Sequence, residues 1–444
     1  MSRAAFADHL RARLGPAAAA PPALLHRLAA RNTPPYAAAL APPDAAAVAE
    51  ALELCAQEGW PVRPAGAGTW LEPRGEPGES GESGDPGGPG EDDTPVLIST
   101  MRLNRIVEHE PADLVVGVEA GVSTGALAAQ LTRHGQWLPL DPPAAEPATI
   151  GAVVAQGSAG PLRAGHGTPR DLALGVRIAT GDGRLVHFGG RVVKNVAGYD
   201  GVRLTVGSGG TLGVITEVYL RVRGAPRDDR TIVVGLGAGA GAAARGADLA
   251  LEIRDQVGCD ALELVSPAVA AALGLGASWT LVARLAGGEA AVQEGVDRLK
   301  WVAERASRTV GGAVSEVGAE PWSRLALLES DAGVAVRLTG RPTSLVEGLG
   351  PVAELAEGPE GGWLCAAHAA DGVIRVWRPE SAPLERATAR LPIPAIGGWT
   401  ARSDRLPVHL EVPRVRRREG VRELTRKIRA VFDPRGILAA GGGQ

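Results

Sequence analysis

Hydrophobic side chains recur with a helical period over Ala45–Glu58. Val48, Leu52 and Cys55 are spaced so that they share one face of such a helix. Asp44 stands where its side chain can accept a hydrogen bond from the first helical turn. The pattern therefore predicts a helix over Ala45–Glu58 with its apolar face turned toward a core.

Short apolar runs bounded by glycine, proline and polar residues fill much of the rest of residues 60–222. Such runs are typical of strands. Gly181-Asp182-Gly183 separates two of them and indicates a hairpin. A helix capped by Ser123 is expected over Ser123–Arg133. The expected strands are Trp60–Pro64, Val96–Ser99, Leu114–Glu119, Leu174–Ala179 and Leu185–Phe188.

Residues 231–410 alternate between strand-like and helix-like patterns, after a polar stretch, Arg223–Arg230, that we interpret as a linker. The alternation predicts one sheet with helices on a face. The last periodic segment, Arg417–Ala430, is expected to be a helix with Val421, Leu424 and Ile428 on one face. The expected strands are Thr231–Leu236, Ala261–Val265, Trp279–Leu285, Val334–Thr339, Trp363–Ala367 and Val373–Trp377, and the helices are Ala243–Val257, Glu289–Ser307, Thr343–Glu354 and Pro383–Leu391.

The composition is that of a globular protein, since 45% of the 444 residues are hydrophobic and 22% are charged. A net charge of −4 and an aromatic content of 3% argue against nucleic-acid binding as the main role. Asp8, His9 and Arg11 interrupt any apolar core of a secretory signal. No apolar run approaches the roughly 20 residues of a membrane span. We expect a cytoplasmic protein, with any membrane contact peripheral, at the inner face, or made through a partner.

Three cysteines, Cys55, Cys259 and Cys365, lie far apart in the sequence. Their spacing is that of neither a metal site nor an iron–sulfur cluster. We therefore expect no metal, and we interpret the three thiols as small buried side chains in a reducing compartment.

Residues 72–95 break the pattern, with eight acidic residues, one arginine and almost nothing apolar. Such a segment cannot bury enough surface to offset its ordering entropy. We interpret it as a disordered acidic surface insertion, with a docking role as the alternative.

Two glycine clusters, Ala65–Trp70 and Ser208–Gly213, could bring backbone N–H groups close to a phosphate. Neither has the spacing of a Rossmann or Walker motif, and each alone could be a plain turn. A third tract, residues 149–160, and Gly165-His166-Gly167 add to them. Four such segments, which we place at strand ends of one unit, suggest a long ligand such as a dinucleotide lying across a sheet edge.

The order of these motifs resembles the FAD-binding domain of the vanillyl-alcohol oxidase/p-cresol methylhydroxylase type. The matching motifs are PAGAGT at 64–69, DP at 141–142, ATIG at 148–151, GHGTPRD at 165–171 and GGTLGVIT at 209–216. Within that superfamily, GGRVVKNVAGYD at 189–200 resembles the FAD-binding subunit of glycolate oxidase. The closing FDPRGIL at 432–438 is similar to the family's C-terminus. The resemblance is strong over 42–222, moderate over 414–438 and thin over 231–410.

The resemblance implies FAD, held non-covalently, with its pyrophosphate at residues 64–69. It places residues 141–142, 149–151 and 156–160 near the flavin and its ribityl chain, and residues 213–215 near the adenine. The residues expected to bind the cofactor are Pro64, Ala65, Gly66, Ala67, Gly68, Thr69, Asp141, Pro142, Thr149, Ile150, Gly151, Gln156, Gly157, Ser158, Gly160, His166, Gly167, Gly213, Val214 and Ile215. His166 stands where some relatives carry a tyrosine, and a covalent flavin bond there is the less favoured alternative.

The resemblance also implies a function as the FAD-binding subunit of a 2-hydroxy-acid (glycolate) oxidase or dehydrogenase complex. A second flavoprotein subunit and an iron–sulfur subunit would be its partners. The alternatives are a stand-alone FAD-linked oxidase or dehydrogenase, and a structural subunit that binds FAD without oxidising substrate. Relatives that work alone carry histidine- and acid-rich motifs near their C-terminus, whereas His368 and His409 stand isolated in this sequence. No catalytic residue is assigned, and Lys194 and Tyr199 are interpreted as structural.

The expected fold class is α+β. It comprises an N-terminal arm (1–41), a two-subdomain FAD-binding domain (42–224, with the acidic insertion at 72–95), a mixed α+β cap domain for substrate or subunit contact (230–412), and a C-terminal helix and tail (413–444). The C-terminal helix is expected to return to the FAD-binding domain.

Overall fold

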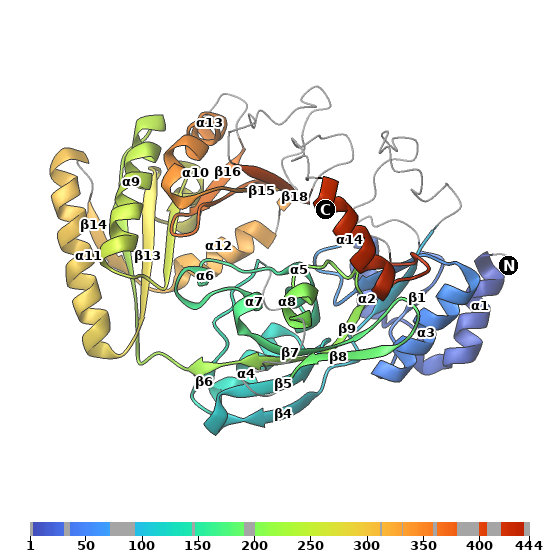
Figure 1. The fold of residues 1–444 in the computed structure, drawn as a ribbon. Coiled ribbons are helices and arrows are strands. Elements are labelled where there is room, and N and C mark those ends of the chain that lie inside the picture. The colour runs from blue at the N-terminus through green and yellow to red at the C-terminus, as the bar shows by residue number, and fades with distance from the viewer. Residues whose placement is uncertain are drawn as a thin grey trace.

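A computed structural model describes residues 3–30, 36–71, 94–143, 147–190, 200–310, 313–330, 332–357, 362–379, 399–405 and 419–438. Most of the acidic segment, the expected helix Pro383–Leu391, and Lys194, Tyr199 and His409 lie outside these ranges. The expected α+β class is confirmed: three main sheets are arranged as two halves of an N-terminal part and one larger unit (Figure 1). None of the helices in these ranges is long and apolar enough to cross a membrane.

The first half is a parallel sheet of three strands in the order β1-β3-β2. Its strands are β1 (Ala39–Leu40), β2 (Val62–Ala65) and β3 (Val96–Ser99), and its helices are α1 (Arg3–Leu14), α2 (Pro22–Ala30) and α3 (Ala45–Glu58). The predicted bounds of α3 and its cap are confirmed, since Asp44 accepts a hydrogen bond from Ala47 N at 2.8 Å. The helix ends where Gly59 adopts a left-handed conformation. The apolar face of α3, formed by Val48, Leu52 and Cys55, is buried in one core with residues of β2 and β3.

The second half is an antiparallel sheet of five strands in the order β4-β5-β9-β7-β8. Its strands are β4 (Ile106–Glu110), β5 (Val115–Glu119), β7 (Ala173–Ala179), β8 (Leu185–Gly189) and β9 (Val214–Arg221). The helices of this half are α4 (Thr124–Thr132), α5 (Ile150–Gln156), α6 (Arg163–His166), α7 (Pro169–Leu172) and α8 (Gly201–Thr205). Residues of α4 and α5 cover one sheet face in a single apolar core.

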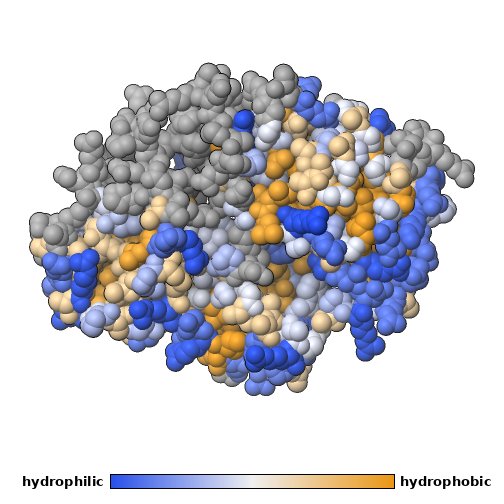
Figure 2. Space-filling view, turned by 180° about the vertical axis from the view of Figure 1, so that it is seen from behind, coloured by the Kyte–Doolittle hydropathy of each residue, from blue (hydrophilic) through white to orange (hydrophobic). Residues whose placement is uncertain are grey.

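The larger unit is an antiparallel sheet of eight strands in the order β14-β11-β13-β12-β16-β17-β15-β18. The strands are β11 (Asp228–Gly235), β12 (Ala261–Val265), β13 (Thr280–Gly287), β14 (Val314–Val317), β15 (Ala332–Thr339), β16 (Leu364–His368), β17 (Val373–Pro379) and β18 (Thr400–Arg405). The helices are α9 (Ala240–Gln256), α10 (Pro267–Leu273), α11 (Glu289–Val310), α12 (Glu320–Ser330) and α13 (Leu345–Glu357). Seen from behind, hydrophilic residues gather at the edge where the outer face of α11 lies (Figure 2).

Three of the sequence interpretations need correction. Helices cover both faces of the eight-stranded sheet rather than one, because α9, α11 and α13 bury one set of alternating strand residues while α10 and α12 bury the other. The expected linker at 223–230 is largely strand: β10 (Arg223–Gly224) pairs with β6 (Gln136–Trp137), and β11 starts at Asp228. The small-residue tract at 149–160 contains a helix, α5, rather than a strand end.

The C-terminal segment returns to the N-terminal part, as expected. Helix α14 (Glu419–Phe432) leads to Ile437, whose carbonyl accepts from Val62 N at 2.7 Å, so the chain end forms a parallel bridge beside β2. The buried Asp433 carboxylate holds this return, accepting from Ile437 N at 3.0 Å and from Leu438 N at 2.7 Å. Two buried N–H groups therefore depend on one side chain.

A polar seam joins the N-terminal part to the eight-stranded sheet. Gly165 N donates to Asp260 O at 3.0 Å. The ion pair Arg163–Asp371 (3.2 Å) and the close approach of His166 Nε2 to Asp260 Oδ1 (3.0 Å) flank this contact. Asp141 lies beside the seam and accepts from Leu162 N at 3.1 Å. Burial raises the pKa of Asp141 to about 7, against the lowering effect of that hydrogen bond.

Replacing Asp433 tests the C-terminal return. We expect Asp433→Ala to lower the free energy of unfolding by about 2–4 kcal/mol, because two buried N–H groups lose their acceptor. Asp433→Asn keeps one acceptor oxygen and should lose clearly less. Urea unfolding of the three proteins makes the comparison, and equal stabilities for the alanine and asparagine variants would contradict the assigned role.

Asp141 should make stability depend on pH. Its folded pKa is raised, so the folded protein keeps the proton between about pH 4 and pH 7 while the unfolded chain releases it. This contribution is therefore lost as the pH rises through about 7. Relative to Asp141→Asn, wild-type stability should fall by at most about 4 kcal/mol across that window, and by less because part of the residue is exposed. Parallel stability profiles of the two proteins in urea would refute the assignment.

Candidate functional site

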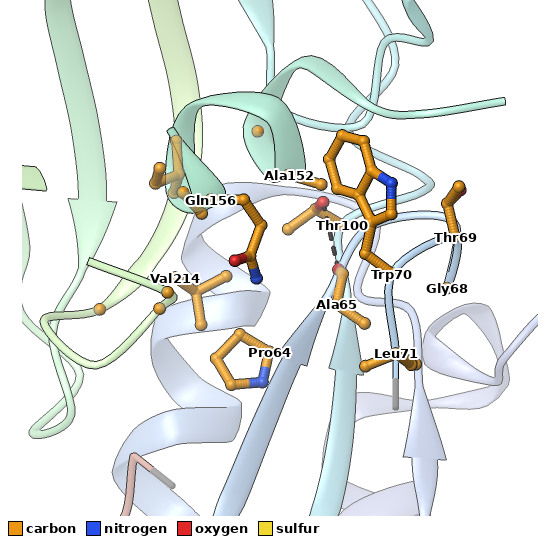
Figure 3. Close-up of a pocket in the computed structure, with 17 residues that line it drawn as sticks. Pro64, Ala65, Gly68, Thr69, Trp70, Leu71, Thr100, Ala152, Gln156 and Val214 are labelled. Atoms are coloured by element: carbon orange, nitrogen blue, oxygen red, sulfur yellow. Dashed lines mark hydrogen bonds between the residues drawn. The ribbon is translucent and has the colours of Figure 1, made fainter. Parts of the chain in front are cut away.

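A cleft opens between the three-stranded and five-stranded sheets, and α5 forms its wall on one side (Figure 3). It encloses about 590 Å³ of space, open solvent included. In the close-up, Gln156 extends from α5 toward Pro64 of β2. The residues that line the cleft are Pro64, Ala65, Gly66, Gly68, Thr69, Trp70, Leu71, Thr100, Gly151, Ala152, Ala155, Gln156, Gly209, Gly210, Gly213, Val214 and Ile215.

The turn after β2 forms the first wall. Thr100 N donates to Ala65 O at 2.9 Å, and Ser99 Oγ donates to Gly66 O at 2.8 Å, so the end of β3 fixes the start of the turn. A Cβ atom at Gly66 would overlap Oγ1 of Thr149, the residue that caps α5. Only glycine therefore allows the turn to pack directly against the start of α5.

The loop Gly207–Gly213 forms the opposite wall and holds the far end of α5. Gly207 N donates to Val154 O at 3.0 Å, and Gly209 N donates to Ala155 O at 2.8 Å. The second bond satisfies a carbonyl group that a helix end otherwise leaves without a partner, and the first adds to the bond that Val154 O accepts from Gly157 N. Gly213 has a φ of 148°, and a Cβ there would lie 2.6 Å from Ala179 O, so the loop turns sharply into β9.

None of the described residues that line the cleft has a charged side chain. The buried N–H groups of Gly66, Ala67 and Gly68 make no hydrogen bond to any described residue. Unpaired buried donors are costly, and a row of them in a turn suits a phosphate oxygen. The arrangement fits an anionic ligand that is held by backbone groups rather than by arginine or lysine.

The expected cofactor residues separate into two groups. Ten of them line the cleft: Pro64, Ala65, Gly66, Gly68, Thr69, Gly151, Gln156, Gly213, Val214 and Ile215. Ala67, Thr149 and Ile150 are buried close behind these walls. Gly157, Ser158 and Gly160 follow α5 and lead to Asp141 and Pro142, while His166 and Gly167 lie at the end of α6, on the seam.

Seven lining residues are missing from the sequence-based set: Trp70, Leu71, Thr100, Ala152, Ala155, Gly209 and Gly210. Thr100 follows a strand, and the other six stand within or next to the recognised motifs. Extending each motif by one helical turn, or to the end of the paired strand, would have found most of them.

His166 takes part in packing at the seam. Its Nε2 lies 3.0 Å from Asp260 Oδ1, and its ring meets Trp137 edge-on with 5.2 Å between centroids. The side chain is largely buried in these contacts. These contacts give His166 a role in joining α6 to the start of β12. They favour the expected non-covalent binding of the cofactor over a covalent bond to His166.

A buried charged network lies on the seam side of the eight-stranded sheet. Glu263 on β12 contacts His368 Nδ1 through Oε1 and accepts from Arg375 Nη2 through Oε2 at 2.7 Å. Arg375 also pairs with Glu329. Burial acts to raise the pKa of Glu263, but His368 and Arg375 outweigh it, and the pKa is lowered. Glu263 therefore stays ionised.

The sequence did not reveal this network, and the view of His368 as isolated is wrong. Glu263 and His368 are 105 residues apart and Glu263 and Arg375 are 112 apart. They meet because β12 pairs with β16 with Glu263 opposite His368, and β16 pairs with β17. An ionised Glu263 requires His368 to donate through Nδ1, so in neutral His368 the Nε2 atom is the acceptor.

Comparison with known proteins identifies a domain in the N-terminal part. Residues 36–189 match the family model described as an FAD binding domain. The chain is 49% identical over 123 residues to the glycolate oxidase subunit GlcE of Escherichia coli, covering 28% of this chain and 35% of that protein. It is 28% identical over 196 residues to the glycolate oxidase subunit GlcD of Bacillus subtilis, covering 44% and 39%. The matches thus span little more than a third of either relative.

The fold has solved counterparts. A chitooligosaccharide oxidase superposes with a TM-score of 0.63 at 14% identity, covering 97% of both chains. At that identity the likeness concerns the fold alone. The matched domain and these relatives show that residues 36–189 form an FAD-binding domain of the vanillyl-alcohol oxidase/p-cresol methylhydroxylase type, and that FAD is the cofactor.

Proposed function

We propose that this chain is the FAD-binding subunit of a 2-hydroxy-acid oxidase or dehydrogenase complex, with glycolate as the model substrate. The observation that carries the proposal is the cleft between the two N-terminal sheets, where no described lining residue is charged and the N–H groups of Gly66, Ala67 and Gly68 bond to no described residue. Two matched relatives named as glycolate oxidase subunits support the substrate class. A second flavoprotein subunit and an iron–sulfur subunit are the proposed partners, and the complex is proposed to be cytoplasmic or peripheral at the inner face of the membrane.

In this proposal the turn after β2, α5 and the Gly207–Gly213 loop hold the cofactor. The expected cofactor residues behind α5, including Asp141, Ser158 and Gly160, continue this surface toward the seam. Bound FAD supplies the two-electron acceptor for oxidation of the CH–OH group. The chain itself must bind the hydroxy acid and accept the hydroxyl proton.

His368 is the group that we propose for that proton. Glu263 fixes its Nδ1–H, and Nε2 is then free to act as the general base in the manner of other carboxylate–histidine pairs. Arg375 keeps Glu263 ionised, as its 2.7 Å hydrogen bond and the lowered pKa of Glu263 indicate. This network favours substrate oxidation by this chain over a purely structural role, and it also keeps the stand-alone oxidase or dehydrogenase as a second candidate.

Gly66→Val tests the cleft. The new side chain would overlap Thr149 and displace the start of α5, so we expect the flavin content of the purified protein to fall at least about tenfold. Gly224→Val is the matched control, because a Cβ at Gly224 meets nothing within 4 Å. Flavin absorbance per protein after reconstitution with FAD is the measurement.

Gln156→Glu is a second cleft variant that preserves shape. A carboxylate in an uncharged lining should repel the pyrophosphate and weaken FAD binding about tenfold or more, with little loss of stability. A charge change in the exposed Gln57 of α3, Gln57→Glu, serves as its control. If both cleft variants retain full flavin content, the cleft is not the cofactor site.

His368→Gln tests the proposed base. The variant should keep its flavin and lose at least about 100-fold in turnover of glycolate with an artificial acceptor. Glu263→Gln should reduce turnover less than His368→Gln does, since it weakens the contact that orients His368 without removing the base. His187→Gln, at an exposed position of β8, is the control. Unchanged turnover in the His368 variant, measured in the complex, would leave the structural-subunit alternative.

A further inference from the structure

Helix α14 exposes an apolar stripe. Val421, Leu424 and Val431 are 50%, 58% and 64% exposed, and Ile428 lies on the same face. These positions repeat at three- and four-residue intervals, which puts them in line along the helix. A surface helix normally turns such a stripe toward a core, so this one is available for another molecule.

The stripe is held in a fixed place. The Phe432 ring lies 6.0 Å from Phe188 of β8, Gly181 N donates to Phe432 O at 2.8 Å, and Arg184 Nη2 donates to Val431 O at 3.1 Å. The C-terminal end of α14 is therefore anchored on the hairpin of β7 and β8. In Figure 1 the helix runs from this anchor toward the top of the view.

The charges beside the stripe are mainly basic. Arg422, Arg426 and Lys427 are exposed, while Glu423 pairs with Arg426 at 2.8 Å and with Lys427 at 3.4 Å. The described helix, Glu419–Phe432, carries four basic and two acidic residues in a chain whose net charge is −4. A basic surface with an apolar centre is complementary to an acidic surface on a partner that also has an apolar centre.

We propose that α14 docks through Val421, Leu424 and Val431 into an apolar groove with a carboxylate rim on a partner subunit. This is recognition of an amphipathic helix by a groove, with the arginines and Lys427 meeting the rim. The inference rests on the proposed function, since it assigns a surface to the partner of that complex.

Two other occupants fit less well. A second copy would bring the same basic helix against itself in a two-fold interface, so that like charges would face each other. An anionic membrane would meet the charge, but none of the exposed stripe residues is aromatic, and three aliphatic side chains bury little in a lipid interface.

The anchor also connects α14 with the cleft. Phe188 packs against Gly201, where an added Cβ would overlap the ring, and Gly201 begins α8. The chain then continues directly from α8 into the Gly207–Gly213 loop that forms a cleft wall. A partner on α14 would therefore dock on the same structural unit that holds the cofactor.

The test uses the native complex, isolated through a tag on this chain, with FAD and iron quantified together. We expect Leu424→Asp to reduce the recovered second flavoprotein at least tenfold while the chain keeps its own flavin and melting temperature. The matched control is Leu327→Asp on α12, where the leucine is 67% exposed. Charge reversal by Arg422→Glu with Lys427→Glu should weaken recovery in a salt-dependent manner without touching the stripe.

The alternatives give different results. A complex that survives Leu424→Asp, or a wild-type chain that recovers no partner, overturns the inference. The inference is also overturned if the wild-type chain recovers no partner but binds vesicles with 30% anionic lipid, and Leu424→Asp abolishes that binding. A dimer of the purified wild-type chain by light scattering that Leu424→Asp dissociates also overturns it. A wild-type chain that takes up no FAD would instead refute the proposed function.

Discussion

The site depends on how closely the short helix α5 is packed at both of its ends. At its start, Gly66 lies against the capping Thr149, and Gly151 packs where a Cβ would lie 2.6 Å from Ala120 Cβ. At its finish, the N–H groups of Gly207 and Gly209 bond to the last carbonyl groups of the helix. A seven-residue helix has little stability of its own. The two sheets therefore hold α5 in place, and α5 in turn sets the width of the cleft between them.

This packing explains how far the sequence could predict the site. Glycine at 66, 151 and 213 was assigned to ligand approach, yet each also avoids a protein contact that a Cβ would create. A motif marks such positions without saying which of the two reasons applies. The sequence did predict the cap of α3 and the strands β3 and β12 with their observed bounds, because local hydrogen bonds and alternation determine them. It missed β4, β14 and β18, which are edge strands of their sheets, where one-sided pairing leaves a weak pattern.

The charged network was beyond the reach of sequence patterns for a different reason. Glu263, His368 and Arg375 come together only through the registers of β12, β16 and β17. A sheet that served merely as a scaffold would be as stable, or more stable, with apolar side chains in their place, because desolvating charges costs several kcal/mol per ion. Buried ionisable groups of this kind gather at functional sites. Their burial on the seam side of the sheet supports the proton-accepting role proposed for His368.

The cleft and the seam thus differ in their electrostatics. The described cleft lining has no charged side chain and offers backbone N–H donors, which suits a phosphate-bearing ligand. The seam contains acids, arginines and histidines in mutual contact. Burial raises the pKa of Asp141 there to about 7, while the lowered pKa of Glu263 keeps that residue ionised. Residues 157–162 connect the two, running from the end of α5 to the Asp141 hydrogen bond at Leu162. Any displacement of α5 would consequently disturb both regions at once, which would couple cofactor binding in the cleft, as proposed, to the geometry around His368.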